Sequence, residues 1–155
     1  MNFTIRQATA SDASAISHLI NGLIHHVLSE PASPDAQPFL AGITSHACAE
    51  RLQSPQFSHY MAEDSFGACG IIALRDGSHV YHLFVREDVH GKGIARALWA
   101  HARETSPHST FTVNSSLSAR PAYERLGFVA KTSPQKFNGL AFVPMTYRHG
   151  GIDYI

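Results

Sequence analysis

Two glycines, one residue apart, stand where an apolar strand-like run meets an amphipathic helix-like run. Residues 81–99 read "YHLFVREDVHGKGIARALW", with Gly91 and Gly93 at the junction. A helix that opens directly after such a turn leaves its first backbone N–H groups without partners and carries about half a positive charge at this end. Glycine lets the backbone turn tightly and approach a ligand closely. The junction therefore predicts a site for a phosphate-bearing ligand.

The residues around these glycines exclude two common phosphate-binding motifs. A Walker A loop requires GxxxxGK[ST], but position 86 is Arg and Lys92 is followed by Gly93. A dinucleotide-binding fingerprint requires a third glycine, but residue 96 is Arg. A plain turn without a ligand stays open as an alternative at this point.

The spacing of apolar residues predicts an α/β layer protein with a mixed, mostly antiparallel central sheet flanked by helices. The expected order is β-α-α-β-β-β-α-β-α-β-β. Strands are expected over residues 3–9, 57–64, 67–74, 79–85 and 110–114, with extended segments over 137–148, where Pro144 suggests an edge or a strand end. Helices are expected over residues 11–28, with Ser11 as N-cap, and over 39–52, 93–105 and 118–126, the last ended by Gly127.

Two stretches, in this order, resemble the motifs of one family. "VREDVHGKGIARALW" resembles the pyrophosphate-binding motif of the GNAT superfamily of acetyl-CoA-dependent N-acetyltransferases, in which Arg/Gln-x-x-Gly-x-Gly/Ala follows the fourth strand. "VNSSLSARPAYERLGF" resembles the second motif of the same family. The resemblance is specific from about residue 79 to residue 128, and it implies a GNAT fold in a single N-acetyltransferase domain over residues 1–155.

One departure from the family pattern lies in the first motif, where the family's Arg/Gln falls on His90. Backbone amides hold most of the pyrophosphate in such a motif, so the change is expected to weaken or retune binding without abolishing it. A non-catalytic acyl-CoA-binding module with the same fold therefore stays open beside the enzyme.

The resemblance implies acetyl-CoA as co-substrate and no metal. Backbone groups of Leu83, Phe84 and Val85 would meet the pantetheine arm, and Asn114 would hydrogen-bond this arm. The pyrophosphate would lie on the backbone amides of His90, Gly91, Lys92, Gly93, Ile94, Ala95 and Arg96. Lys92, Arg96 and Arg125 are either partners of the ribose phosphate or ordinary solvated charges.

Acetyl transfer to an amine requires a free amine, an oxyanion site and a proton for the leaving thiolate. The resemblance places Tyr123 near the sulfur and makes it the expected general acid, because a phenol with a pKa of about 10 is protonated at neutral pH. The expected base is His79, in the region where several relatives carry a carboxylate, with Tyr81 and His82 as alternatives. The backbone amide of Val85 is the expected oxyanion donor.

Strand alternation predicts that His79, Tyr81 and Leu83 share one face of the fourth strand, while His82 and Phe84 take the other. Tyr81 is expected to meet the acceptor. In the family, acceptor specificity comes from the loop between the first two helices and from the late strands. There Glu30 and Asp35 are candidates to attract a cationic amine, and Glu63 and Asp64 are weaker ones. The acceptor is either a small molecule or a peptide amine.

Composition sets the remaining expectations about partners and location. Lys plus Arg and Asp plus Glu number 12 each, so the chain lacks the positive charge typical of nucleic-acid or membrane-binding surfaces. Neither a leader nor a long apolar run is found, which predicts a cytoplasmic protein; a homodimer is left open. Cys48 and Cys69 lack CxxC spacing and are expected to be reduced, buried thiols.

Eleven histidines raise the alternative of a metalloprotein. No HExxH, HxH or Cys-plus-His spacing supports it. His25 and His26 are adjacent, so on a helix they diverge by about 100° and are not expected to face one ion.

Overall fold

A computed structural model describes residues 2–28, 34–137 and 140–149. In this part of the chain an eight-stranded sheet has the order β1-β2-β3-β4-β5-β8-β6, with β7 also paired to β8. The strands are β1 (Thr4–Gln7), β2 (Phe57–Asp64), β3 (Gly67–Arg75), β4 (His79–Val85), β5 (Thr110–Ser116), β6 (Val129–Ala130), β7 (Gln135–Phe137) and β8 (Leu140–Arg148). The β4–β5 pair is parallel and the other pairs are antiparallel, so the expected mixed α/β fold is confirmed.

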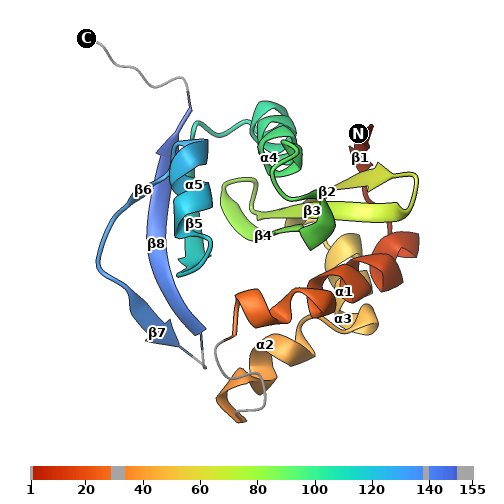
Figure 1. Cartoon of the computed structure of the whole chain (residues 1–155), viewed down its shortest axis with the longest axis horizontal. Helices are drawn as coiled ribbons and strands as arrows, with labels where there is room; N and C mark the ends of the chain where they lie inside the picture. Colours follow the sequence, from red (N-terminus) through yellow and green to blue (C-terminus); the bar gives the residue numbers. More distant parts are fainter. Residues whose placement is uncertain (1, 29–33, 138–139, 150–155) are drawn as a thin grey trace.

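Helices cover both faces of this sheet (Figure 1). The α-helices are α1 (Ala13–Gly22), α2 (Gln37–Ala41), α3 (Ser45–Gln53), α4 (Ile94–Thr105) and α5 (Arg120–Leu126). Short 3-10 turns are η1 (Ala10–Asp12), η2 (Ile24–His26), η3 (Pro34–Ala36) and η4 (Glu87–Val89). None of the helices in the described ranges is long and apolar enough to cross a membrane.

Two clusters of buried side chains form the core, one on each side of β3. Side chains of α1 and α3 pack with Met61 and Ile71 in one cluster. Side chains of α4 pack with Ile72 and Leu74 in the other, which extends through Phe111 to Tyr123 on α5. Alternation along β3 thus sends consecutive isoleucines to opposite faces, as expected for a strand covered on both sides.

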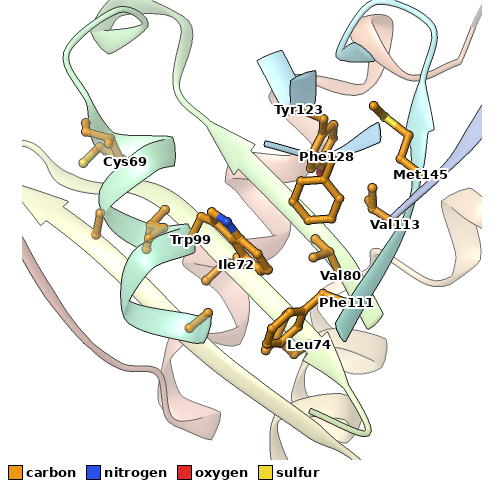
Figure 2. Packing of buried hydrophobic residues seen from close by; sticks show 14 of the residues in the cluster. Cys69, Ile72, Leu74, Val80, Trp99, Phe111, Val113, Tyr123, Phe128 and Met145 are labelled. Carbon is orange, nitrogen blue, oxygen red and sulfur yellow. The ribbon is translucent and has the colours of Figure 1, made fainter. Parts of the chain in front are cut away.

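Trp99 of α4 lies at the centre of the second cluster (Figure 2). Its ring is fully buried and meets Phe111 edge-on at 5.0 Å between centroids, with Phe128 at the same distance. Edge-on aromatic pairs of this kind add about 0.5–1.5 kcal/mol beyond the area they bury. This cluster joins β5 and α5 to the central strands at the point where those elements approach β4.

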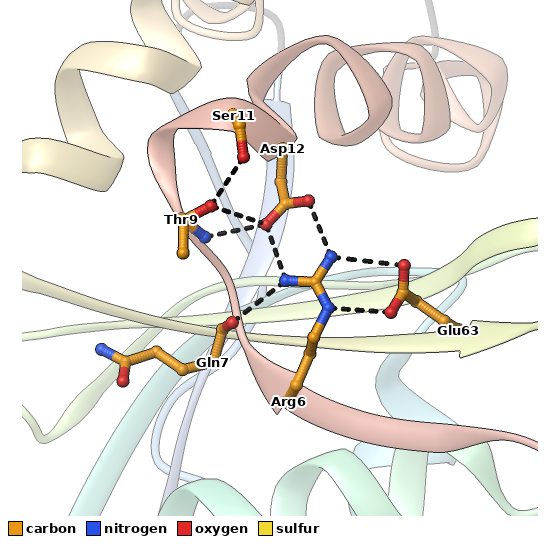
Figure 3. Close-up of polar contacts among 6 residues, drawn as sticks. All are labelled: Arg6, Gln7, Thr9, Ser11, Asp12 and Glu63. Carbon is orange, nitrogen blue, oxygen red and sulfur yellow. Dashed lines mark hydrogen bonds and ion pairs between the residues drawn. The ribbon is translucent and has the colours of Figure 1, made fainter.

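An arginine network fixes the start of the chain to the sheet (Figure 3). Arg6 of β1 donates to both carboxylate oxygens of Asp12 at 2.8 and 2.9 Å and to Glu63 of β2 at 2.8 Å. These hydrogen bonds hold the pKa of the Asp12 carboxyl below its usual value. Asp12 also accepts from the backbone N–H of Thr9, completing a capping box. The predicted N-cap, Ser11, is wrong, because Thr9 and Asp12 cap this turn and Ser11 only hydrogen-bonds the Thr9 hydroxyl.

The predicted helix over residues 39–52 is interrupted. Gly42 closes α2, and Thr44 begins α3 as a new N-cap whose hydroxyl accepts from the backbone N–H of Ala47 at 3.1 Å. The buried carbonyl of Ile43 between them accepts from Ser17 and Asn21 of α1. The predicted helix over residues 11–28 is likewise shorter, ending at Gly22 before η2.

Pro144 does not mark an edge or a strand end; it lies in the middle of β8, opposite Asn114 of β5. Its carbonyl accepts from Lys131, just after β6, at 2.8 Å. The N and O atoms of one residue point to the same side of a strand, so the nitrogen of Pro144 also faces the side of β6 and β7. The N–H that proline lacks would lie in the gap between these two strands. The two-residue β6 was not predicted from the sequence, and the proline is tolerated because of this gap.

Candidate active site

A cleft opens where β4 and β5 separate. The two strands pair only at His79–Thr112 and Val80–Val113, and beyond these residues they diverge (Figure 1). The cleft has a volume of about 990 Å³ and is lined from both strands, from α4 and α5 and from β8. Because β4 is parallel to β5 for so short a length, the β5-facing edge of its later residues is open to a ligand.

Backbone hydrogen bonds decide which residues of β4 present groups to that edge. Arg86 N–H donates to the Cys69 carbonyl at 2.8 Å, and Phe84 is paired with Ile71 of β3. Alternation then directs the N–H and C=O groups of Leu83 and Val85 toward the cleft. Phe84 was expected to present backbone groups as well. Its backbone instead faces β3, and Phe84 lines the cleft with its side chain.

The glycine turn at the start of α4 lies at one end of the cleft. Gly91 and Gly93 have φ of 78° and 84°, in the left-handed region that favours glycine. A Cβ at either position would meet nothing within 4 Å, so their conformation rather than crowding by the protein calls for glycine. The first helical bond of α4 is donated by Ala97 to the Gly93 carbonyl at 3.0 Å, which leaves the preceding amides facing the turn.

Most of the expected cofactor-binding residues line this cleft. The backbone N–H of His90, which was expected to bind the pyrophosphate, instead donates to the Glu87 carbonyl at 3.1 Å. The lining of the cleft includes Leu83, Phe84, Val85, His90, Gly91, Gly93, Ile94, Ala95, Arg96, Asn114 and Tyr123, as well as Arg125. Lys92 is the exception: it is exposed and is not part of the lining. The backbone of Gly91 and Gly93 forms the concave side of the turn, and the Lys92 side chain is exposed to solvent outside the cleft.

Two side chains that were not assigned this role hold the turn against the sheet. Arg86 donates to the Asp64 carboxylate on β2 at 2.5 Å and to the Asp88 carboxylate in η4 at 2.6 Å. The hydrogen bond to Asp64 lowers the pKa of the Asp64 carboxyl. His90, at the family's Arg/Gln position, places Nε2 2.7 Å from the Val85 carbonyl. Position 86 was noted in the sequence only because it excludes a Walker loop, and its anchoring role depends on a partner 22 residues away.

Tyr123 of α5 reaches the cleft from the opposite wall. The side chain is 7% exposed and packs edge-on against Phe128 at 5.4 Å. Burial raises the pKa of its phenol, so the hydroxyl keeps its proton at neutral pH. No hydrogen-bond acceptor for this hydroxyl is found among residues 2–28, 34–137 and 140–149, which leaves it available to a ligand.

The predicted alternation along β4 is confirmed for His82 and Phe84, which share a face opposite Leu83, but it is wrong in the first half of the strand because of a β-bulge at Tyr81. Val80 pairs with Leu74 and His82 with Ala73, so Tyr81 is the extra residue. Val80 therefore lies on the α4 face together with Leu83, whereas His82 lies on the α1 face with Phe84, its ring 5.5 Å away. Tyr81 does not share a face with Leu83.

His79 lies at the closed end of the cleft, where β4 and β5 still pair. Its Nδ1 is 2.7 Å from the Thr112 hydroxyl, which fixes the ring. Burial lowers the pKa of this imidazole, and the positive charge of Arg75 lowers it further. His79 is therefore neutral at pH 7 and able to accept a proton.

A pair of buried histidines beside Tyr81 was missed in the sequence. His59 of β2 and His82 of β4 flank the small residue Ala73 of β3 in one row of the sheet. Each is 6% exposed, and burial lowers the pKa of His59 to about 4 and that of His82 to about 3, with a further contribution from Arg51. Only the pairing register of three strands brings them together.

Three of the four carboxylates expected at the acceptor site, those of Asp35, Glu63 and Asp64, are not part of the cleft lining. Glu63 pairs with Arg6 and Asp64 with Arg86, and neither lines the cleft. Glu30 lies outside the described residues. Asp35 is in η3 and is likewise not part of the lining.

The adjacent histidines of η2 converge, contrary to the prediction. Nε2 of His25 and of His26 lie 3.5 and 3.3 Å from the two carboxylate oxygens of Glu87. The three groups offer ligand atoms within 4.8 Å of one another, all at the surface. Consecutive residues of a 3-10 turn diverge by about 120°, so the convergence comes from the side chains, whose rings bend together to a centroid distance of 4.1 Å.

Comparisons with known proteins agree with this architecture. A family model described as an acetyltransferase (GNAT) domain matches residues 27–149. A GCN5-related N-acetyltransferase from Rhodopseudomonas palustris shares 21% identity and a TM-score of 0.76, with 96% of each chain covered. The PaiA N-acetyltransferase from Thermoplasma acidophilum, solved with coenzyme A, shares 13% identity and a TM-score of 0.77 over 96% of this chain and 100% of that one.

A mutant spermidine N-acetyltransferase from Vibrio cholerae is 15% identical, with a TM-score of 0.65 over 94% of this chain and 93% of that one. At these identities the structures show the same fold. A search of curated proteins gives no significant match.

Proposed function

The chain belongs to the GNAT acetyltransferase family of N-acyltransferase enzymes, and from this premise we propose that it moves the acetyl group of acetyl-CoA to a primary amine. The acceptor is a small molecule or a peptide amine, attacked directly in a ternary complex. We further propose that residues 1–155 act as one domain. The observation that carries the proposal is the cleft, which combines a glycine turn at a helix start, an open strand edge and a buried tyrosine.

Each part of the cofactor has a matching feature in the cleft. The amides at the start of α4 suit a pyrophosphate, because they are unpaired and lie at the positive end of the helix. The cleft-facing backbone groups of Leu83 suit the amides of a pantetheine arm, which would pair with β4 as an added strand, whereas Val85, whose carbonyl meets His90 Nε2 at 2.7 Å, offers its N–H to the acetyl end of the cofactor. Arg96 and Arg125 line the same end and suit the ribose phosphate.

The chemistry then falls to three groups. Neutral His79 takes a proton from the substrate ammonium, and the free amine attacks the thioester carbonyl. A cleft-facing amide of β4, that of Val85 in our proposal, stabilises the oxyanion of the tetrahedral intermediate. As the C–S bond breaks, Tyr123 donates its phenolic proton to the leaving thiolate, and the positively charged nitrogen of the intermediate returns a proton to the phenolate through solvent, which leaves the neutral amide.

Two measurements on the purified protein test this function. Calorimetry should show saturable binding of acetyl-CoA, and a thiol-release assay with a panel of primary amines should show turnover that depends on the amine. Binding without turnover for any amine would instead favour the non-catalytic acyl-CoA-binding module. Absence of both would contradict the function altogether.

A further inference from the structure

The end of the cleft that lies opposite the glycine turn carries basic and aromatic groups. It is formed by Phe39 of α2, Arg75 of β3 and the residues His79, Tyr81, His82 and Phe84 of β4. No aspartate or glutamate is among the lining residues in the described part of the chain, although arginines and histidines are. Among residues 2–28, 34–137 and 140–149, an ammonium-rich acceptor such as a polyamine would find no carboxylate partner on these walls.

Arg75 is the charged group that this end offers to a ligand. Its guanidinium lies 5.9 Å from the Tyr81 ring centroid, and within residues 2–28, 34–137 and 140–149 no ion pair or side-chain hydrogen bond engages it. A guanidinium that lines a cleft and has no carboxylate of its own is suited to bind one, since its planar fork matches a carboxylate with two parallel hydrogen bonds.

Neighbouring groups strengthen the positive potential around Arg75. Arg51 of α3 lies over the same tyrosine ring at 5.2 Å. It donates to the Gly42 carbonyl, and its buried Nε has no hydrogen-bond partner among the residues that the structure describes. Two arginines beside one ring leave an excess of positive charge at this end of the cleft.

Arg75 also lies directly beside the proposed base. It is opposite His79 in the antiparallel pairing of β3 and β4, and its charge is one of the causes that lower the pKa of His79. Side chains of such a pair project from positions about 5 Å apart. A single acceptor can therefore place its amine at His79 while an anionic group of the same molecule meets Arg75.

The rest of the cleft lining is largely apolar. Besides Phe39 and Phe84, it includes Leu23 and Val27 from the α1 side and, farther along the cleft, Leu140 and Phe142 from β8, of which Phe142 pairs with Ser116. These walls suit an apolar or aromatic body between or beside the two polar groups.

We propose that the acceptor is an amine that also carries a carboxylate and an apolar or aromatic body, with Arg75 as the residue that binds the carboxylate. The inference rests on the proposed acetyltransferase function and adds the substrate class. It replaces the expectation, drawn from Glu30 and Asp35, that the site attracts a cationic amine.

Matched pairs of amines test the proposal in the thiol-release assay. Phenylalanine is compared with phenylalaninamide, and 4-(aminomethyl)benzoate with 4-(aminomethyl)benzamide, and spermidine serves as the polycation. We expect at least one acid to be preferred over its amide by about 10- to 100-fold in kcat/KM, the range of a charge-assisted bidentate contact. Arg75→Gln should remove this preference, and Arg75→Lys should restore part of it.

Arg148→Gln is the matched control, because Arg148 is an exposed arginine at the end of β8, away from the cleft lining. It should keep the preference of the parent. Equal use of acids and amides, a preference for spermidine, or the same effect from Arg75→Gln and Arg148→Gln would overturn the proposal while leaving the acetyltransferase function intact.

A binding measurement separates failure of the proposal from failure of the function. Calorimetric titration of 4-(aminomethyl)benzoate and of phenylalanine into protein saturated with coenzyme A should show binding that Arg75→Gln weakens by about tenfold or more. If acids bind in this way but no amine is turned over, the substrate class stands and catalysis fails. If neither acid binds, the substrate class fails whatever the turnover.

Discussion

The two ends of the cleft differ in the groups that form them: backbone groups at one end and side chains at the other. At the glycine turn, Gly93, Ile94, Ala95 and Arg96 contribute the backbone N–H groups that precede the first helical bond of α4, and the side chains contribute mainly shape. At the other end, Arg75, His79 and Phe39 come from three separate elements and act through their side chains. The difference teaches that a site made of backbone is encoded in one short stretch, whereas a site made of side chains depends on how strands and helices align.

The largest expected effect tests a side chain that lies between the two ends. Tyr123→Phe keeps the ring, its contact with Phe128 and most of its buried area. We expect the turnover number to fall by about 10²- to 10⁴-fold with acetyl-CoA affinity unchanged, because the proton is donated only in the transition state. Turnover and calorimetric affinity should be measured on the same preparation.

Tyr147→Phe is the control for this substitution. Tyr147 packs on the same Phe128 at 5.4 Å but is not part of the cleft lining. Its variant should retain the turnover of the parent. A Tyr123→Phe turnover within about twofold of the parent would end the assignment of Tyr123 as general acid.

The second effect concerns stability at the side-chain-built end. His59 has a folded-state pKa of about 4, below its unfolded value of 6.5, so the unfolded state binds more protons between these values. Stability is fully present above pH 6.5 and falls as the pH drops toward 4, by on the order of 3 kcal/mol for this residue. His82, with a pKa of about 3, acts in the same direction.

Denaturant unfolding at several pH values measures this loss. His59→Gln should flatten the slope of the unfolding free energy between pH 6.5 and 4, whatever its effect on the absolute stability. His46→Gln, at an exposed position of α3, should leave the slope unchanged. Parallel slopes for all three proteins would show that His59 does not titrate as the burial implies.

The third effect tests the backbone-built end. Gly93→Val places a Cβ in the open space where the pyrophosphate is proposed to bind, at a φ of 84°. We expect acetyl-CoA affinity to fall by about 10- to 100-fold, while the left-handed conformation costs about 1–2 kcal/mol of stability. Calorimetry and thermal melts with and without acetyl-CoA separate the two losses.

Gly67→Val is a close match for this substitution. Gly67 also has a positive φ, 107°, and open space at its Cβ, but it lies at the start of β3 outside the cleft lining. It should lose a similar amount of stability and keep its affinity. Equal affinities of the two variants would show that Gly93 serves the turn alone.

The smallest effect concerns the base. His79→Ala should lower turnover about tenfold, below the usual range for a positioned base, because a water can take the proton instead. The parent rate should rise with pH across a pKa below 6.5, and the variant should lack this step. The Michaelis constant for acetyl-CoA should not change.

Thr112→Val keeps the imidazole and removes the hydroxyl 2.7 Å from its Nδ1. It should cost only two- to threefold in turnover, as expected for loss of one positioning contact. If His79→Ala has the same pH–rate profile as the parent, His79 takes no part in proton transfer.

The same contrast explains what the sequence could predict. β2 and β4 were predicted to the residue, and the glycine turn was placed correctly, since apolar runs and glycines are local signals. The bulge at Tyr81, the row of His59 and His82, and the pairing of Arg75 with His79 follow from strand register. Strand register is set by packing across the sheet, so it cannot be predicted from the residues that are adjacent in sequence.

The boundaries of the helices predicted over residues 11–28 and 39–52 were wrong for a related reason, whereas those of α4 and α5 were predicted to within two residues. The break between α2 and α3 is stabilised by Ser17 and Asn21, which reach the Ile43 carbonyl from a distant helix. Thr44 is a recognisable N-cap, but apolar spacing through Ile43 resembled one continuous helix. Lys92 was counted with the turn because of its position in the motif, although the conformation of its neighbours directs it to solvent.

The bulge in β4 also bears on how such a protein can change over generations. Tyr81 is an extra residue in the strand, so the alternation of side chains between the two faces of the sheet is interrupted there. Residues before Tyr81 and residues after it therefore follow two separate alternating patterns. Substitutions at residues 79–81 alter one end of the cleft and leave Leu83 and Val85 in register with Ile72 and Gly70. If the proposed function holds, mutation in the first half of this strand can change the acceptor while the second half keeps the backbone groups proposed to bind the acyl donor.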